Sequence, residues 1–331
     1  MKKFIPFVFI LGAIWFSLAM TETGVELMVT GKTPVWEVLR DLGEPSPNHE
    51  ITILPEKAST EIGRRIVHYG SAKSVKQQSV HFVCTSCHNT EKEFADLRNT
   101  DPQKRLEYAQ ENGLPFLPGS PLYGVVNRSS FYNGDYEIKY GDLVKPARNN
   151  LREAIQLCAV ECSQGRDLKN WEIESVLSYL WTLELKMEDL KIPEQDYGKF
   201  TKKPDGSAGL IEEIKSYYQT DSPAHFVAPP ENRKEGYGLI GDPSNGEHIY
   251  KLSCLHCHGD QRYSFLDLND GRLSRKLLGK HFPRFSYYSS YQVIRYGAPP
   301  HPGKRAYMPQ FTSEKMSDQQ VEDLRAYLTK K

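Results

Sequence analysis

Two five-residue motifs in this chain combine thiols and an imidazole at a spacing that suits cofactor attachment. Residues 84–88 read CTSCH and residues 254–258 read CLHCH, so both are C-x-x-C-H. Two thiols at this spacing can add to the two vinyl groups of one porphyrin, and the following histidine can ligate the iron. The pattern predicts two covalently bound c-type haems. The predicted attachment residues are Cys84, Cys87, His88, Cys254, Cys257 and His258.

Two other interpretations of the motifs are weaker. A zinc site would need two further ligands near each cysteine pair, and a thioredoxin-like redox pair would need a βαβ setting. Neither requires a histidine directly after the second cysteine, yet this histidine occurs in both motifs. We therefore expect iron of haem at each motif.

The segments around the motifs repeat. The stretch NGEHIYKLSCLHCHG carries an amphipathic pattern into the second motif, and SDQQVEDLRAYL begins at Ser317, a good helix N-cap. The stretch NWEIESVLSYLWTLEL begins at Asn170, which we expect to cap a matching helix, and Tyr179 and Tyr327 occupy the same place in the two stretches. The expected apolar stripes are Ile173, Val176 and Leu180 in one stretch and Val321, Leu324 and Leu328 in the other. The repeat predicts two haem modules in tandem.

In this arrangement the chain resembles the class I c-type cytochromes over about residues 60–187 and 240–331. In that family an N-terminal helix that carries the motif crosses a C-terminal helix, and the haem lies in the pocket between them. The resemblance implies a mainly α fold of two tandem cytochrome c domains with long loops and an interdomain linker.

The remaining segments have simpler expected roles. The linker is rich in Pro, Gly, Lys and Asp and is expected to pack on both domains, with a free tether as the alternative; GLIEEIKSYYQ is its one expected helix. The full division is a signal peptide or N-terminal anchor at 1–20, an N-terminal extension at 21–59, cytochrome c domain 1 at 60–187, the linker at 188–239 and cytochrome c domain 2 at 240–331.

The N-terminus predicts export. Two lysines precede an apolar run at 4–16 that ends in small residues, as in a secretory signal. An uncleaved anchor is the alternative, because the run 4–20 is at the short limit for spanning a bilayer. The body is therefore expected outside the cytoplasm, in the periplasm or its equivalent, touching a membrane only through this segment. With 42 Lys plus Arg and 42 Asp plus Glu, the chain gives no reason to expect nucleic acid as a partner.

The sixth iron ligand differs between the two expected domains. Met308 follows His258 by 50 residues and precedes Tyr327 by 19, which resembles the methionine ligand of class I cytochromes c. Met316 is the nearby rival, and a core role is the plain alternative for either residue. The first domain has no methionine between His88 and Met187, so its soft ligand is missing.

Two cysteines fall where the repeat places the missing ligand. Cys158 and Cys162 precede Tyr179 by 21 and 17 residues. They are candidate thiolate ligands of the first iron or reactive thiols in sulfur chemistry. A disulfide between them is the structural alternative in an exported protein, although two side chains one helical turn apart lie near the edge of workable geometry. Lys145 is the remaining ligand candidate.

The stretch around these cysteines resembles the diheme thiosulfate dehydrogenases and the related SoxA-type cytochromes, over about residues 150–185. In the thiosulfate dehydrogenases the N-terminal haem has a cysteine ligand and the C-terminal haem usually a methionine. Matching Gly165, Arg166 and Leu168 to the family's Ser-Met-Asn-Gly-type segment places Cys158 at the ligand. Cys162 then stands where the family has a serine.

This resemblance implies an exported diheme cytochrome that oxidises a small inorganic sulfur anion, thiosulfate to tetrathionate, and passes electrons to an acceptor protein. A thiolate ligand lowers the potential of one haem and a thioether raises that of the other. Arg166, beside the cysteines, and Arg128 are the expected cationic partners of the substrate, with a surface or haem-propionate role as the alternative for each. The alternative function is a non-catalytic electron carrier or the cytochrome subunit of a larger respiratory complex.

Overall fold

The computed structural model describes residues 28–73, 83–201, 206–221, 223–286, 288–298 and 308–330. In these ranges the fold is helical and has no β-strand, only isolated antiparallel bridges between Pro34 and Lys186 and between Ala298 and Met308. The mainly α prediction is confirmed. The expected signal or anchor segment lies outside the described residues, and none of the described helices is long and apolar enough to cross a membrane.

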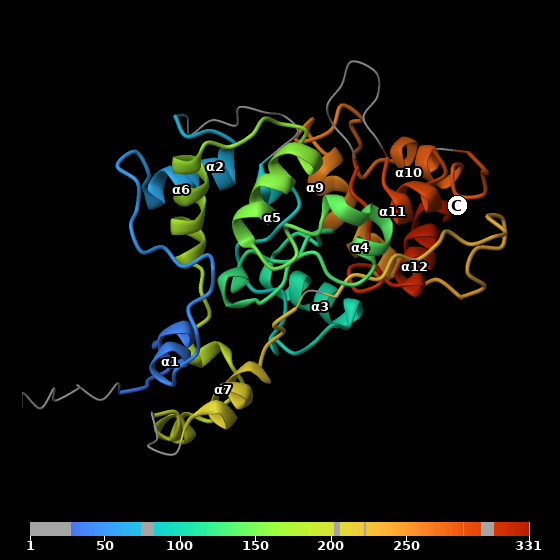
Figure 1. The fold of residues 1–331 in the computed structure, drawn as a ribbon. Helices are drawn as coiled ribbons and strands as arrows, with labels where there is room; N and C mark the ends of the chain where they lie inside the picture. Colours follow the sequence, from blue (N-terminus) through green and yellow to red (C-terminus); the bar gives the residue numbers. More distant parts are fainter. Residues whose placement is uncertain are drawn as a thin grey trace, which may run out of the picture.

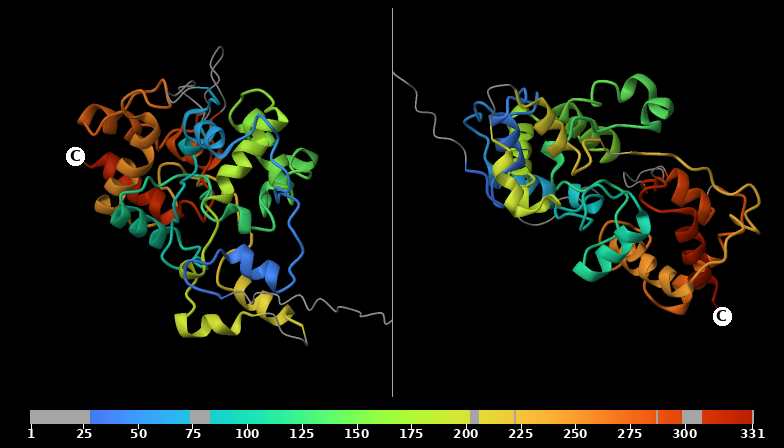
Figure 2. Two further views of the ribbon diagram at one scale, coloured as in Figure 1. Left: turned by 90° about the vertical axis from the view of Figure 1, so that its left-hand side faces the viewer. Right: turned by 90° about the horizontal axis from the view of Figure 1, so that it is seen from below.

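The α-helices follow the chain from the blue end to the red end of Figure 1. They are α1 Val35–Asp41, α2 Thr60–Tyr69, α3 Pro102–Asn112, α4 Asp135–Tyr140, α5 Leu151–Leu157, α6 Asn170–Trp181, α7 Ala208–Lys215, α8 Pro243–Ile249, α9 Leu255–His258, α10 Arg272–Gly279, α11 Ser290–Tyr296 and α12 Asp318–Thr329. In Figures 1 and 2, α2, α5 and α6 gather in one part of the molecule and α9 to α12 in another.

The same helix crossing occurs in both parts. Helix α2 crosses α6 so closely that a Cβ on Gly63 would lie 1.8 Å from the Ser175 carbonyl oxygen. Helix α8 crosses α12 in the same way, and a Cβ on Gly246 would lie 2.0 Å from the Asp323 carbonyl oxygen. Ser175 and Asp323 each precede by four residues the tyrosine that the sequence analysis paired, at 179 and 327. The internal repeat seen in the sequence is therefore also a repeat of packing geometry.

One predicted cap is confirmed and the other is wrong. Ser317 caps α12, and its side chain accepts a hydrogen bond from the backbone N–H of Gln320 at 3.1 Å. Asn170 is not a cap but the first residue of α6, whose N-cap is Lys169. The Glu172 carboxylate accepts from the Lys169 backbone N–H at 2.9 Å. Because a side chain from the first turn satisfies this donor, the helix begins without the short polar cap that the sequence suggested.

The predicted stripes are buried. Of the α6 stripe, Val176 and Leu180 are buried and Ile173 packs against the same core. The α12 stripe is buried along its whole length. This second core also includes Leu106 of α3 and Phe116, and the Phe116 backbone N–H donates to the Leu252 carbonyl at 2.9 Å. The two parts of the molecule therefore share packing and are not joined by a linker alone.

A third apolar cluster joins the N-terminal extension to the linker. Helix α1 packs against α7 and the segment 185–200 (Figure 1, lower part). Its buried residues are Val35, Val38, Leu39, Leu42, Leu185, Met187, Leu190, Ile192, Tyr197, Phe200, Ile211, Ile214 and Tyr218. The single helix expected in the linker is α7. Further along, the linker bonds to both parts: Ser129 N–H donates to the Thr220 carbonyl at 2.9 Å, and Tyr237 N–H donates to Glu322 at 2.8 Å. These contacts agree with a packed linker.

Candidate haem sites

The first motif presents its histidine in a fixed orientation. A 3₁₀ turn, Cys84–Ser86, leads into the motif's last two residues. His88 Nδ1 lies 2.6 Å from the Ser120 carbonyl oxygen, so this nitrogen carries the proton and Nε2 keeps its lone pair. Gly119 makes the approach possible, because a Cβ there would lie 2.6 Å from the imidazole ring. Burial lowers the pKa of His88, which favours the neutral ring that an iron site requires.

The second motif is built in the same way. A π-helical turn, Tyr250–Cys254, leads directly into α9, which ends at His258. His258 Nδ1 lies 3.0 Å from the Leu266 carbonyl oxygen, and burial lowers the pKa of this histidine as well. The ring of Tyr250 lies 5.7 Å from that of Tyr327 on α12. The helix that carries the motif is thus fixed against the terminal helix.

The surroundings of both motifs fit haem better than the alternatives. Burial raises the pKa of Cys84 to about 11 and that of Cys254 to about 12, as expected for thiols against apolar surface. Within the described ranges no group of three or more His, Cys, Asp or Glu side chains is placed to hold a metal ion. The absence of strands in the same ranges disfavours the thioredoxin-like interpretation. No disulfide joins any of the six cysteines, all of which lie within the described ranges.

The two motifs touch each other. Cys257 Sγ lies 3.7 Å from the Ser86 carbonyl oxygen, so residues inside the two C-x-x-C-H sequences are in direct contact. A groove of about 700 Å³ opens at this junction, between Thr85 and His88 of one motif and Leu255 and His256 of the other. Separate modules on a tether would not require such a contact. The geometry brings the two attachment sites within one shared environment.

The cysteine pair lies at the first motif. Helix α5 ends at Leu157 and continues as a π-helical turn, Cys158–Cys162. Wide turns of this kind occur frequently at functional sites. The two thiols form a hydrogen bond, and Cys158 also interacts electrostatically with Cys84 and Cys87. The structure therefore brings Cys158 close to Cys84 and Cys87, which precede it by 74 and 71 residues in the sequence.

The protonation of Cys158 depends on its surroundings. The hydrogen bond with Cys162 and then burial raise the pKa of Cys158 well above its ordinary value. Among the described residues, the groups that shift this pKa are other thiols, all of which raise it, so they favour the neutral form of Cys158. A thiolate at this position needs a strong positive charge, which ferric iron has.

A row of tyrosines beside the cysteines escaped the sequence analysis. The Tyr132 hydroxyl interacts with Cys162, and the rings of Tyr132 and Tyr136 are 5.2 Å apart. The Tyr136 and Tyr140 rings are 6.0 Å apart, and Tyr140 is partly exposed. The signal was available, because these tyrosines recur every fourth residue. They form the aromatic cover over the cysteine pair.

The backbone of the candidate ligand Met308 is held by hydrogen bonds. Met308 and Ala298 exchange two backbone hydrogen bonds of 2.9 Å, and the Met308 side chain packs against the core that also contacts Cys254. Met316 is 1% exposed and packs within that core, which agrees with the core role given as its alternative. Lys145 is disfavoured as a ligand, because its side chain is 58% exposed and its ammonium pairs with Asp142.

The two candidate arginines do not lie together. Arg166 follows the cysteine turn, but it is 63% exposed and pairs with Glu172 at 2.7 Å. Arg128 lies on the histidine side of the first motif, where it interacts electrostatically with His88 and Glu93. Arg166 therefore lies near the cysteine turn, but its charge is already paired with Glu172. Arg128 lines a cavity near His88 instead.

A buried ion cluster between the two parts was also missed. Arg105 and Glu93 are almost fully buried and pair at 3.2 Å, and Lys315 reaches Glu93 at 3.3 Å from the second part of the chain. The Arg105 guanidinium lies 4.0 Å from the Phe116 ring centroid. No motif in the sequence marks this cluster, because its members are separated by up to 222 residues.

Comparison with known families supports the geometry of the second site. Residues 241–328 match the family model described as cytochrome C oxidase, cbb3-type, subunit III. This part of the chain is a cytochrome c domain. It contains the second motif, Met308 and α12, and it makes the chain an electron-transfer haem protein. Neither the curated proteins nor the solved structures gave a match.

Proposed function

We propose that the chain is an exported diheme cytochrome c whose first haem oxidises a small inorganic sulfur anion, with thiosulfate to tetrathionate as the reaction. The single observation that carries this proposal is the position of Cys158 and Cys162 beside the first attachment motif. The repeated helix crossing and the repeated histidine–carbonyl hydrogen bond support haem at the first motif.

Two bound haems would supply the two one-electron acceptors that are needed when two thiosulfate anions join through a new S–S bond. Cys158 places a sulfur atom at the first site as the proposed iron ligand, with Cys162 as the second candidate. The Ser120 carbonyl oxygen accepts a hydrogen bond from the Nδ1–H of His88 and so orients the imidazole that would ligate the first iron. Tyr132 and Tyr136 lie near the thiols, and their rings, with that of Tyr140, would limit access of water to them.

The contact between the motifs supports electron transfer from the first site to the second. Ser86 and Cys257 are in contact, so electrons leaving the first site need not cross a solvent gap. Met308, as a thioether ligand, would stabilise the ferrous state at the second site. The direction of transfer is then from the first site to the second and on to an acceptor protein.

Export by the N-terminal segment 1–20 completes the proposal. An exported location gives access to thiosulfate outside the cytoplasm and suits covalent haem attachment. A membrane contact would exist only if this segment stays uncleaved.

The test is to add thiosulfate to the oxidised holoprotein and follow the haem absorption bands. We expect reduction by the wild type, none by Cys158→Ser, and retention of a low-spin electron paramagnetic resonance signal with narrow g-spread only when Cys158 is present. Cys162→Ser restores the residue type of the resembled family and is the matched control, which we expect to keep the signal. A Cys158–Cys162 disulfide found by peptide mapping, with a different signal, would refute the ligand role.

A second candidate function follows from the family match. The matched family is named for a subunit of a cytochrome oxidase, so the chain is alternatively an electron-carrying subunit. In that case thiosulfate would leave the oxidised haems unchanged, whereas a partner cytochrome or oxidase would exchange electrons with them rapidly.

A further inference from the structure

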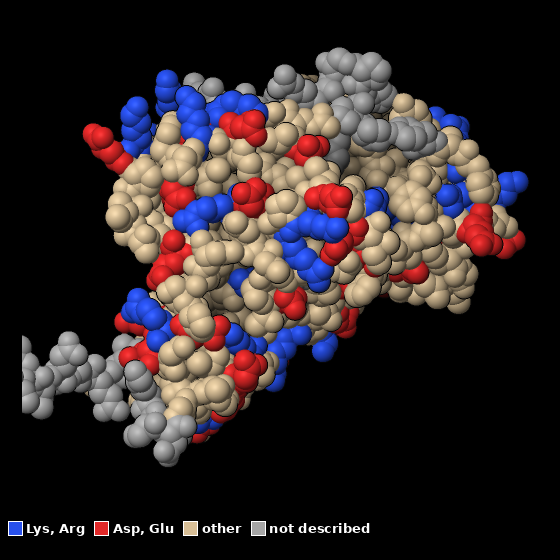
Figure 3. All heavy atoms as spheres, viewed as in Figure 1, with Lys and Arg blue, Asp and Glu red and all other residues tan. Residues whose placement is uncertain are grey.

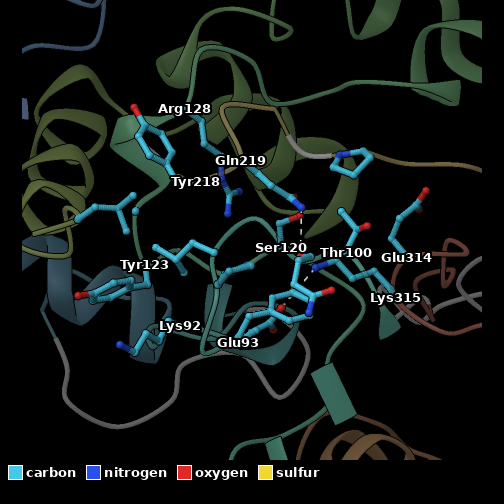
Figure 4. Close-up of a pocket in the computed structure, with 17 residues that line it drawn as sticks. Lys92, Glu93, Thr100, Ser120, Tyr123, Arg128, Tyr218, Gln219, Glu314 and Lys315 are labelled. Atoms are coloured by element: carbon cyan, nitrogen blue, oxygen red, sulfur yellow. Dashed lines mark hydrogen bonds and ion pairs between the residues drawn. The ribbon is translucent and has the colours of Figure 1, made fainter. Parts of the chain in front are cut away.

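A cavity near His88 of the first motif is lined by more cationic than anionic side chains. Figure 4 shows Arg128 reaching into this cavity, with Glu93 and Lys315 across from it. The cavity has about 70 Å³ of room for the centres of water-sized molecules. Since a single water needs roughly 10–15 Å³ on this measure, a small anion with several oxygens fits. Its walls come from both parts of the chain and from the linker, at Tyr218 and Gln219.

Most charged groups at the cavity already have partners. Lys92 pairs with Asp189 at 3.3 Å, and Glu314 pairs with His225. The Lys92–Asp189 pair is neutral, and the Glu314 carboxylate, which raises the pKa of His225, is balanced when that imidazole is protonated. The remaining charges are therefore those at its centre.

The central charges sum to an excess of two positive charges. Glu93 is the single carboxylate, and it is shared by Arg105 at 3.2 Å and Lys315 at 3.3 Å. The structure gives the Arg128 guanidinium no hydrogen bond to any described residue. Two cations on one carboxylate, plus a partly buried guanidinium that has no hydrogen bond to a described residue, leave donors at the cavity that a bound anion would satisfy.

The pKa shifts agree with this excess. Burial lowers the pKa of Arg128 to about 10. Burial, opposed by Glu93 and assisted by Arg105 and Arg128, lowers the pKa of Lys315 to about 8. Both shifts report positive charge held away from water without full compensation.

We propose that this cavity is a binding site for a small tetrahedral oxyanion, held by Arg128 and Lys315. It is separate from the cysteine pair and does not depend on the sulfur oxidation proposed above. The same cations interact electrostatically with His88, whose Nδ1 bonds to the carbonyl of Ser120 in the cavity wall. A bound anion therefore adds negative charge near the first iron, favours its ferric state and lowers its reduction potential.

The experiment titrates oxidised holoprotein with sodium sulfate in a calorimeter at pH 7 and constant ionic strength. Sulfate is not a redox substrate, so this result stands apart from any failure of thiosulfate oxidation. We expect one saturable site in the wild type and about tenfold or greater weakening in Arg128→Gln and in Lys315→Gln. Arg128→Lys keeps the charge and should retain part of the affinity. Lys145→Gln removes an exposed, paired charge elsewhere and should bind sulfate as the wild type does.

The second readout is the reduction potential of each haem with and without sulfate. Sulfate should lower one potential in the wild type and in Lys145→Gln and leave it unchanged in Arg128→Gln. Two results would overturn the proposal. Equal binding by all variants would indicate an adventitious ion only. No saturable binding by the wild type, combined with a shifted potential in Arg128→Gln, would mean that a haem propionate occupies the cations. The absorption spectrum of each variant checks that it has folded with haem attached.

Discussion

At the scale of single residues, one backbone carbonyl oxygen fixes the orientation and the protonated nitrogen of each motif histidine. Ser120 and Leu266 accept from the Nδ1 nitrogens of His88 and His258, and neither carbonyl could be identified from the sequence. The histidines themselves were predictable, because their place after C-x-x-C is a covalent requirement. Their partners were not, because a backbone carbonyl bonds in the same way whatever side chain it carries.

The proposed role of Met308 gives a prediction at this scale. Met308→Ala removes a thioether that stabilises ferrous iron, while the backbone pairing with Ala298 persists. We expect the reduction potential of one haem to fall and the near-infrared band of methionine-ligated ferric haem to vanish. Potentiometric titration and near-infrared absorption measure both effects.

Met316→Leu is the matched control, because Met316 fills the core and a similar volume is kept. This variant should retain both the band and the potential. If the band survives Met308→Ala, another residue holds the second iron.

At the scale of elements, Gly63 and Gly246 allow the close helix crossing that occurs in both parts of the molecule. Gly246→Ala would place a methyl group 2.0 Å from the Asp323 carbonyl oxygen. The helices must separate, and we expect a loss of about 3 kcal/mol in the free energy of unfolding. Urea denaturation followed by circular dichroism measures it.

Gly209 in α7 provides the control for this substitution. A Cβ at Gly209 would meet nothing within 4 Å. Gly209→Ala should therefore be neutral or stabilise by up to about 1 kcal/mol, as alanine does in an open helical site. Equal effects of the two substitutions would mean that the crossing is not as close as described.

Glu184, just after α6, gives a prediction about pH. Burial and then the nearby Glu37 raise the pKa of Glu184 to about 7. The folded state therefore holds a proton that the unfolded state releases between about pH 4.5 and 7, so stability falls as pH rises across that window. Because Glu184 is partly exposed, we expect Glu184→Gln to stabilise the protein by only about 1–2 kcal/mol at pH 8.

The gain from Glu184→Gln should disappear near pH 5, where the wild-type carboxyl is neutral in the fold. Thermal or urea unfolding at the two pH values measures the difference. Glu111→Gln, at an exposed position of α3, should show the same difference at both pH values. A gain from Glu184→Gln that does not change with pH would contradict the assigned cause.

At the scale of the whole molecule, the sequence predicted the repeat but not how its copies meet. The stripes of α6 and α12 were visible because a helical period is a local pattern. The contact of Cys257 with Ser86 and the ion cluster of Glu93, Arg105 and Lys315 join distant segments, and no local pattern records them. The same holds for the packing of α1 on α7. Figure 3 shows Lys and Arg interspersed with Asp and Glu over the displayed face, in keeping with the balanced composition.

The measurement that tests the central claim most directly is the mass of the intact, mature protein after acid–acetone extraction. Two C-x-x-C-H motifs, each with a carbonyl-oriented histidine, predict a mass increased by two covalently attached haems. The double substitution Cys84→Ser and Cys87→Ser should leave a mass increased by one. A wild-type protein that carries a single haem, or zinc in place of haem at the first motif, would contradict the account.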